Sequence, residues 1–224
     1  MVYWLDFVTF SPPGFYGKDV AIDVVSLVVV LLIGWFSFKN FLLDRKNSKQ
    51  LLLSSAFLVL AASFAVKIAT NVFTHVEGAY QYHFWLAAGF LAQLFLMLFG
   101  YYVLYALTSK DAYITMNYVI MAYFILAMTY FARFNYHWFY LTAVIFLIAA
   151  TRRYFIAYRK NKYKNTLLLA KSFALIALSQ VLFIFTFTYR WVYMTAEIIQ
   201  LLGYCLLAYI FFQVLKNARK KNKD

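Results

Sequence analysis

The chain has 224 residues, of which 65% are hydrophobic and 22% aromatic, whereas only 13% are charged, and the formal net charge is +13. Soluble domains carry about 25% charged residues around one compact core, so this composition excludes a soluble globular protein and leaves no room for a folded soluble domain. The positive charge by itself suggests nucleic acid, but its distribution along the chain indicates a membrane topology instead.

The first 19 residues are predicted to be an extracellular segment without a cleavable signal peptide, because they lack a basic start followed by a continuous apolar run. Seven apolar segments follow, each with the about 20 residues that cross a hydrocarbon layer of about 30 Å. Both prolines of the chain precede the first segment, so the predicted helices are continuous. The predicted spans are 20–40, 51–73, 84–107, 113–132, 138–158, 166–188 and 192–215, followed by a basic tail over 216–224.

Basic residues determine the predicted orientation. The first, third and fifth connections and the tail hold 17 of the 21 Lys and Arg residues with three acidic residues, and the opposite side holds four basic and five acidic residues. The first side therefore carries a net charge of +14 and the opposite side −1. Because positively charged segments stay in the cytoplasm, this difference predicts an extracellular N-terminus and a cytoplasmic C-terminus. The sequence thus predicts an all-α, polytopic cell-membrane protein with seven transmembrane helices.

The basic clusters at 152–164 and 216–223 are predicted to contact anionic lipid headgroups of the bilayer on the cytoplasmic side. Docking of a cytoplasmic or membrane protein partner on these clusters is the alternative. Nucleic acid is not an expected partner, because Tyr154, Phe155 and Tyr158 are typical interfacial anchors rather than base-stacking platforms. Cys205 is the only cysteine, so an intrachain disulfide is excluded.

The chain matches itself when it is shifted by 116 residues, which places the first two predicted spans on the fifth and sixth. With a shorter second outer loop, the third span falls on the seventh. A chance match between helices rich in Leu, Phe and Ala is the alternative to duplication. A duplication gives a parallel repeat of 20–107 and 138–215 around a linker helix, 113–132. The matched residues include Phe57 with Phe173, Ala61 with Ala177, Ser63 with Ser179, Thr70 with Thr186, and Leu98-Phe99-Gly100-Tyr101 with Leu201-Leu202-Gly203-Tyr204.

This layout of three helices, a linker helix and three further helices resembles the transporter–opsin superfamily, which includes sugar and PQ-loop transporters and microbial rhodopsins. The resemblance covers the whole chain at the level of topology. The chain has no Pro-Gln pair, and its last predicted span has no mid-helix lysine that could attach retinal. The resemblance therefore implies a seven-helix 3+1+3 bundle, and it implies no particular ligand. The cofactor is left unknown.

Asp23, Lys67 and Glu197 lie at similar predicted depths, roughly 5–9 Å below the outer boundary. Because charged groups inside a bilayer need a partner, a water-filled cavity or a function, we expect Lys67 to lie between the two carboxylates in a polar pocket that opens outward. The surplus negative charge favours a shared proton or a cationic guest. Helical spacing and depth complete the set of predicted ligand-binding residues, which are Asp23, Lys67, Asn71, Gln93, Gln180, Glu197, Gln200 and Tyr204.

Two alternatives to this pocket remain. Lys67 can extend along its own stem to the headgroups, which would make the three residues an ordinary polar rim. A true ion pair can also serve helix packing alone, without a ligand.

The histidines suggest a weaker candidate. His75, Glu77 and His83 have the ligand types of a zinc or copper site, but their spacing matches no tight motif. Nucleophilic catalysis lacks support as well, because the serines inside the predicted spans have no histidine within reach. We therefore predict no catalytic residues.

Three functional hypotheses follow. The leading one is a non-enzymatic, receptor-like or sensory membrane protein that binds a small solute or ion in the outer pocket. The second is a transporter of a small solute, coupled to protons through Asp23 and Glu197. The third is a metal-dependent membrane enzyme that uses the outer histidines.

Overall fold

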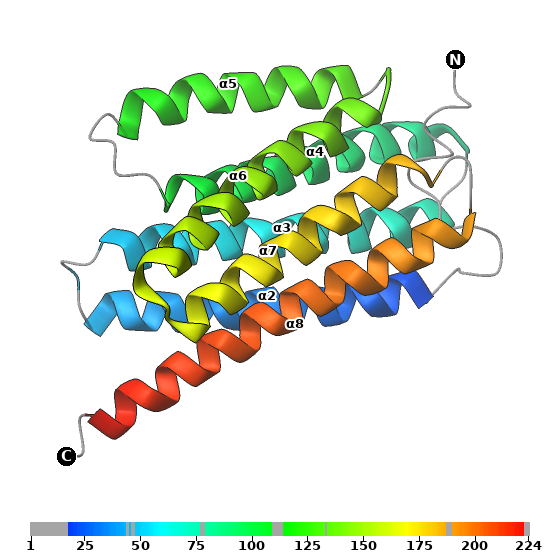
Figure 1. The fold of residues 1–224 in the computed structure, drawn as a ribbon. Helices are drawn as coiled ribbons and strands as arrows, with labels where there is room; N and C mark the ends of the chain where they lie inside the picture. The colour runs from blue at the N-terminus through cyan, green and yellow to red at the C-terminus, as the bar shows by residue number, and fades with distance from the viewer. Residues whose placement is uncertain are drawn as a thin grey trace.

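In the computed structural model, the described residues form seven helices and no strand (Figure 1). The backbone is described over 18–43, 45, 48–76, 79–108, 114–132, 134–186 and 190–221, and the side chains over the same ranges except 73–87, 114–117, 190 and 215–221. The helices are α2 (Lys18–Leu43), α3 (Ser48–Val76), α4 (Ala79–Ala106), α5 (Ile114–Ala132), α6 (His137–Asn161), α7 (Lys164–Ile184) and α8 (Arg190–Lys221).

Six of these helices, all except α5, are long and apolar enough to cross a membrane. Their outward-facing side chains are also apolar, as Val28, Ile145 and Leu202 illustrate. A soluble bundle would place polar residues on that surface, since amphipathic helices bury only one stripe. The chain is therefore a helical, multi-pass membrane protein. Helix α5 is apolar too, but the part whose side chains are described, 118–132, is shorter.

The helices extend beyond the predicted spans. Helix α2 begins at Lys18, inside the predicted N-terminal segment, and α8 continues through most of the predicted tail to Lys221. The predicted outer loop 74–83 is mostly helical, because α3 ends at Val76 and α4 begins at Ala79. Hydropathy locates only the part of a helix that lies in hydrocarbon, whereas backbone hydrogen bonding continues into polar sequence, so helix boundaries are the least predictable feature.

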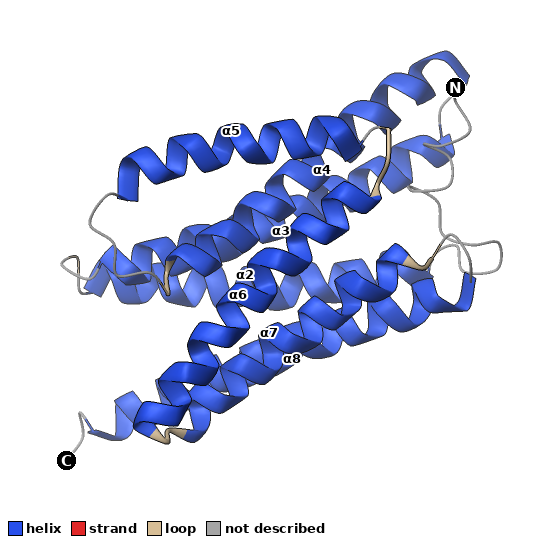
Figure 2. Cartoon of the chain, turned by 45° about the horizontal axis from the view of Figure 1, so that its top comes forward, coloured by secondary structure: helices blue, strands red, loops and turns tan. Residues whose placement is uncertain are grey.

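The helices form two groups of three that pack in the same way. Helix α3 packs between α2 and α4, and α7 packs between α6 and α8. Between the groups, α2 contacts α8 and α4 contacts α6. Helix α5 lies at the edge of the bundle, where its main contacts are with α4 and α6 (Figures 1 and 2).

Two glycines allow close approach at matching places in these groups. A Cβ atom on Gly100 of α4 would lie 2.6 Å from Leu60 Cγ of α3, and a Cβ atom on Gly203 of α8 would lie 2.6 Å from Ile176 Cγ1 of α7. Small residues at helix crossings let backbones pack closely in a membrane, where van der Waals contact drives association. An alanine at either position would therefore force the facing side chain to shift.

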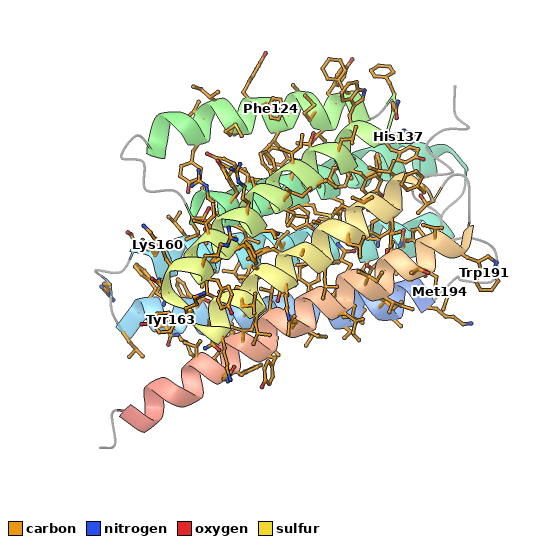
Figure 3. All side chains as sticks on the ribbon, viewed as in Figure 1. Phe124, His137, Lys160, Tyr163, Trp191 and Met194 are labelled. Carbon is orange, nitrogen blue, oxygen red and sulfur yellow. The ribbon has the colours of Figure 1, made fainter. Side chains whose placement is uncertain are left out.

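The two ends of the bundle carry different residues. His137, Trp191 and Met194 lie at the end where α6 and α8 begin, and Lys160 and Tyr163 lie at the opposite end (Figure 3). We call these the Trp191 end and the Lys160 end. The basic residues Arg159 and Lys160 lie in the last turn of α6, so the Lys160 end is the one that the charge distribution predicts to be cytoplasmic.

Candidate binding pocket

The Lys67 ammonium lies between two carboxylates. Its Nζ donates hydrogen bonds to Asp23 Oδ1 at 2.8 Å and to Glu197 Oε1 at 2.7 Å. The side chains of Asp23 and Glu197 are 0% and 2% exposed, and that of Lys67 is 17% exposed. Lys67 thus turns inward, as the sequence predicted, and does not extend along its own helix to the surface.

Helical spacing brings these groups together from three helices. Asp23 belongs to the buried stripe of α2 that also contains Asp19 and Ser26. Lys67 lies on α3, and Glu197 lies on α8. Because α2 packs against both α3 and α8, the side chains of Asp23, Lys67 and Glu197 meet between these three helices.

Asp19 was not among the predicted site residues, because it was assigned to the extracellular segment. In the structure it lies in the first turn of α2, one turn before Asp23, and it is buried. The positive end of a helix dipole stabilises an acidic side chain in the first turn. That first-turn position was the signal that could have placed Asp19 in the helix.

The triad of Asp23, Lys67 and Glu197 carries a formal charge of −1. Both carboxylates are buried, and Asp23 Oδ2 has no hydrogen-bond partner among the described residues. An uncompensated charge in a low-dielectric interior is strongly unfavourable. The triad therefore needs a further proton, cation or hydrogen-bond donor to balance it.

A cavity of about 50 Å³ lies beside the triad. Since a water needs at least about 10–15 Å³ by this measure, the cavity holds a few waters or a solute of a few heavy atoms. Of the eight predicted ligand-binding residues, the six that line it are Lys67, Asn71, Gln93, Gln180, Glu197 and Gln200.

The other two predicted residues lie next to the cavity rather than on its wall. Asp23 holds Lys67 from α2. Tyr204 lies one helical turn beyond Gln200, where its hydroxyl meets that of Tyr101 at 3.0 Å. Gln200 Nε2 also donates to the Tyr101 hydroxyl, at 3.3 Å. These buried side chains form a polar floor that joins α4 to α8, and thereby one group of three helices to the other.

Amide groups of the cavity wall are only partly satisfied. Ser63 Oγ donates to the backbone carbonyl of Gln93 at 3.0 Å, which links α3 to α4. Gln180 Nε2 donates to Ser179 Oγ at 3.4 Å. The Gln180 side chain is 0% exposed, and its Oε1 has no hydrogen-bond partner among the residues that the structure describes. A buried acceptor without a partner costs about 1–3 kcal/mol, so a hydrogen bond from a guest that reached this oxygen would be stabilising.

Aromatic rings complete the wall. Phe183 stacks on Tyr140, with ring centroids 5.3 Å apart, and meets Tyr193 edge to face at 5.7 Å. All three rings line the cavity. The sequence did not single them out among 20 Tyr and 25 Phe residues. Helical spacing was the available signal, because Phe183 follows Gln180 by three residues and Tyr193 precedes Glu197 by four.

The weak metal candidates cannot be placed. The side chains of His75 and His83, and Glu77 entirely, lie outside the described residues. Among the side chains that the structure does describe, no group of three His, Cys, Asp or Glu residues could hold a metal ion.

Comparison with known proteins yields no relative. No protein-family model, curated protein or solved structure matches the chain significantly. The resemblance to the transporter–opsin superfamily therefore stays a prediction from topology, and the pocket has to be interpreted from its own chemistry.

Proposed function

We propose that this protein is a non-enzymatic, seven-helix membrane protein that binds a small solute or ion in the cavity beside Lys67, and that it acts as a receptor-like or sensory module. The observation that carries the proposal is a cavity lined by an ion pair and three glutamines inside an otherwise apolar bundle. Packing alone does not account for it, because polar groups in a membrane interior are costly to bury.

The seventh span in this proposal is α5. Its 19 residues extend about 28 Å as a helix, close to the hydrocarbon thickness of about 30 Å. Val119, Tyr123 and Leu126 on its surface are exposed, as lipid-facing side chains would be. With seven spans, the two ends of the chain lie on opposite sides of the membrane. The basic residues at the Lys160 end favour the cytoplasm for that end. The Trp191 end, close to Glu197 of the pocket on α8, then faces the outside.

We also infer that the two groups of three helices are duplicates, in the 3+1+3 arrangement. Leu60 and Ile176 are 116 residues apart, which is the shift that aligns the first two spans with the fifth and sixth. Each of them contacts a glycine at an equivalent helix crossing, Gly100 or Gly203. These matched crossings support duplication over a chance match, since composition alone does not set contact geometry.

The tyrosine pair supports the same inference. Tyr101 and Tyr204 directly follow the two matched glycines in the sequence. Their hydroxyls meet at 3.0 Å in the buried junction between the groups. Equivalent residues of two repeats meet in this way only beside the pseudo-two-fold axis that relates the repeats.

The second candidate function is transport of the same solute. One observation favours it. The Lys67–Glu197 ion pair and the Tyr101–Tyr204 hydrogen bond both join one group of helices to the other. Rocking of one repeat against the other, the usual mechanism of transporters built from repeats, would break and re-form these two links.

A binding screen tests the proposal. The purified protein in lipid nanodiscs is titrated with small cations, anions and neutral solutes, and its unfolding temperature is followed, since a ligand that binds only the folded state stabilises it by mass action. We expect at least one solute to stabilise wild type and Gln213→Met equally and Gln180→Met less, because Gln180 lines the cavity and Gln213 does not.

The same screen can refute the proposal. If no solute of any charge stabilises the wild type, or if Gln180→Met responds like the wild type, the cavity is not a binding site. Liposome uptake of a solute that binds then separates the two candidates: a receptor binds without flux, and a transporter accumulates the solute.

A further inference from the structure

We infer that the ligand of this pocket is a small cation with N–H donors, of the ammonium or primary-ammonium type. The inference rests on the proposed function, because it assigns the chemistry of the guest that the cavity beside Lys67 binds. It draws on four properties of the pocket: charge, unpartnered acceptors, aromatic walls and size.

The formal charge of the triad indicates whether the guest is a cation or an anion. Two buried carboxylates and one ammonium give the triad a formal charge of −1 beside the cavity. Among the described residues of the cavity wall, Lys67 is the only basic side chain, and it is already paired with two carboxylates. An anionic guest would add a second uncompensated negative charge, whereas a monovalent cation makes the site neutral.

Unpartnered atoms show that the guest donates hydrogen bonds. Gln180 Oε1 and Asp23 Oδ2 are both buried acceptors that lack a hydrogen-bond partner within the described part of the chain. No side-chain donor on the described part of the cavity wall is left buried and unpartnered in this way. A guest with N–H groups supplies what Gln180 Oε1 lacks, while its charge offsets the surplus on the carboxylates.

Lys67 itself demonstrates which chemistry these carboxylates accept. Its ammonium makes charge-assisted hydrogen bonds of 2.7 and 2.8 Å, which are short and typical of N⁺–H···O⁻ contacts. Glu197 lines the cavity while Asp23 lies behind Lys67. Glu197 is therefore the carboxylate that a second ammonium can reach from the cavity.

Aromatic walls and size narrow the class further. Tyr140, Phe183 and Tyr193 belong to the cavity wall, and aromatic rings attract cations at their faces through their quadrupole. The volume of about 50 Å³ admits ammonium or methylammonium and disfavours bulky quaternary amines.

Methylammonium chloride is the probe that tests this inference, with the protein in nanodiscs and sodium chloride holding the ionic strength constant. We expect methylammonium to raise the unfolding temperature saturably, and tetramethylammonium, acetate and formamide to leave it unchanged. Tetramethylammonium keeps the charge but has no N–H donor, acetate reverses the charge, and formamide keeps N–H donors without charge.

Two variants locate the site. Glu197→Gln should weaken methylammonium binding about tenfold or more, as loss of one charge-assisted hydrogen bond implies. Gln180→Met removes the unpartnered acceptor without removing a charge, and it should weaken binding about threefold to tenfold. Gln213→Met, outside the cavity, is the matched control and should bind like the wild type. If Glu197→Gln fails to fold, Gln180→Met alone still decides.

The outcomes separate this inference from the proposed function. Stabilisation by acetate or formamide in place of methylammonium would overturn the cation assignment while leaving a binding pocket. Equal stabilisation by tetramethylammonium would overturn the requirement for N–H donors. If none of the four probes raises the unfolding temperature and the wider screen finds no ligand, the cavity is not a binding site and the proposed function fails as well.

Discussion

Replacing Lys67 by methionine should be among the most damaging single changes in this protein. Methionine keeps the length and flexibility of the lysine stem but removes its charge. Asp23 and Glu197 would then face each other across the position of the ammonium, with side chains that are 0% and 2% exposed. Removing one partner of a buried ion pair costs about 3–5 kcal/mol. Because two carboxylates lose their partner here, we expect a loss near the upper end of that range.

Neutralising all three residues should reverse most of this loss. In the triple variant Asp23→Asn, Lys67→Met, Glu197→Gln, no charge remains buried. Replacement of a whole buried ion pair by uncharged residues is often neutral in stability, so we expect the triple variant to lie within about 1–2 kcal/mol of the wild type. Asp23→Asn or Glu197→Gln alone leaves Lys67 with one carboxylate, a neutral pair, and should cost less than Lys67→Met.

Reversible unfolding in mixed detergent micelles measures these free energies, and a matched lysine provides the control. Lys171 is exposed on α7, so Lys171→Met should change the free energy of unfolding by no more than about 0.5 kcal/mol. The reasoning is refuted if Lys67→Met is no less stable than Lys171→Met. It is refuted as well if the triple variant is less stable than Lys67→Met, since the defect would then come from packing and not from stranded charge.

Three further predictions concern the floor, the helix crossings and the orientation. Tyr101→Phe should cost about 1–2 kcal/mol, because the Tyr101 hydroxyl contacts both the Tyr204 hydroxyl and Gln200 Nε2; an unchanged free energy in denaturant unfolding would argue against the floor. Gly203→Ala should lower the unfolding temperature by overpacking worth about 1–3 kcal/mol, although alanine usually stabilises helices; a rise would contradict the close crossing. In a variant without Cys205, a cysteine introduced by Trp191→Cys should react with a membrane-impermeant maleimide in intact cells. A cysteine introduced by Lys160→Cys should react only after the cells are permeabilised. The reverse pattern would contradict the proposed orientation.

The helices were predictable because each is encoded by its own segment. A run of about 20 apolar residues specifies a membrane helix with little reference to the rest of the chain. The ends of the helices were not predictable in the same way. Helix α8 continues to Lys221 through sequence that is basic rather than apolar, because intrahelical hydrogen bonds do not require a lipid environment.

The ionic core of the site was predictable for a different reason. A charge inside a membrane span is rare and costly, so Lys67 had few available partners, and only Asp23 and Glu197 lay at its depth. The aromatic wall and the tyrosine floor lacked such a signal. Phe183 and Tyr101 are each one of many similar residues, and their roles depend on how helices rotate and cross, which periodicity does not determine.

The proposed duplication relates the helices of the two groups but not the charged residues of the pocket. Under the shifts that superpose the two groups, the counterparts of Asp23 and Lys67 are Phe139 and Phe183, and that of Glu197 is Leu94. All three counterparts are buried apolar side chains. Apolar side chains thus occupy the positions equivalent to all three charged residues, two in the second group and one in the first, so the described residues form no second, symmetry-related triad. The formal charge of −1 on the triad therefore has no counterpart across the proposed axis, and either a proton on a carboxylate or a cation in the cavity beside Lys67 would balance it.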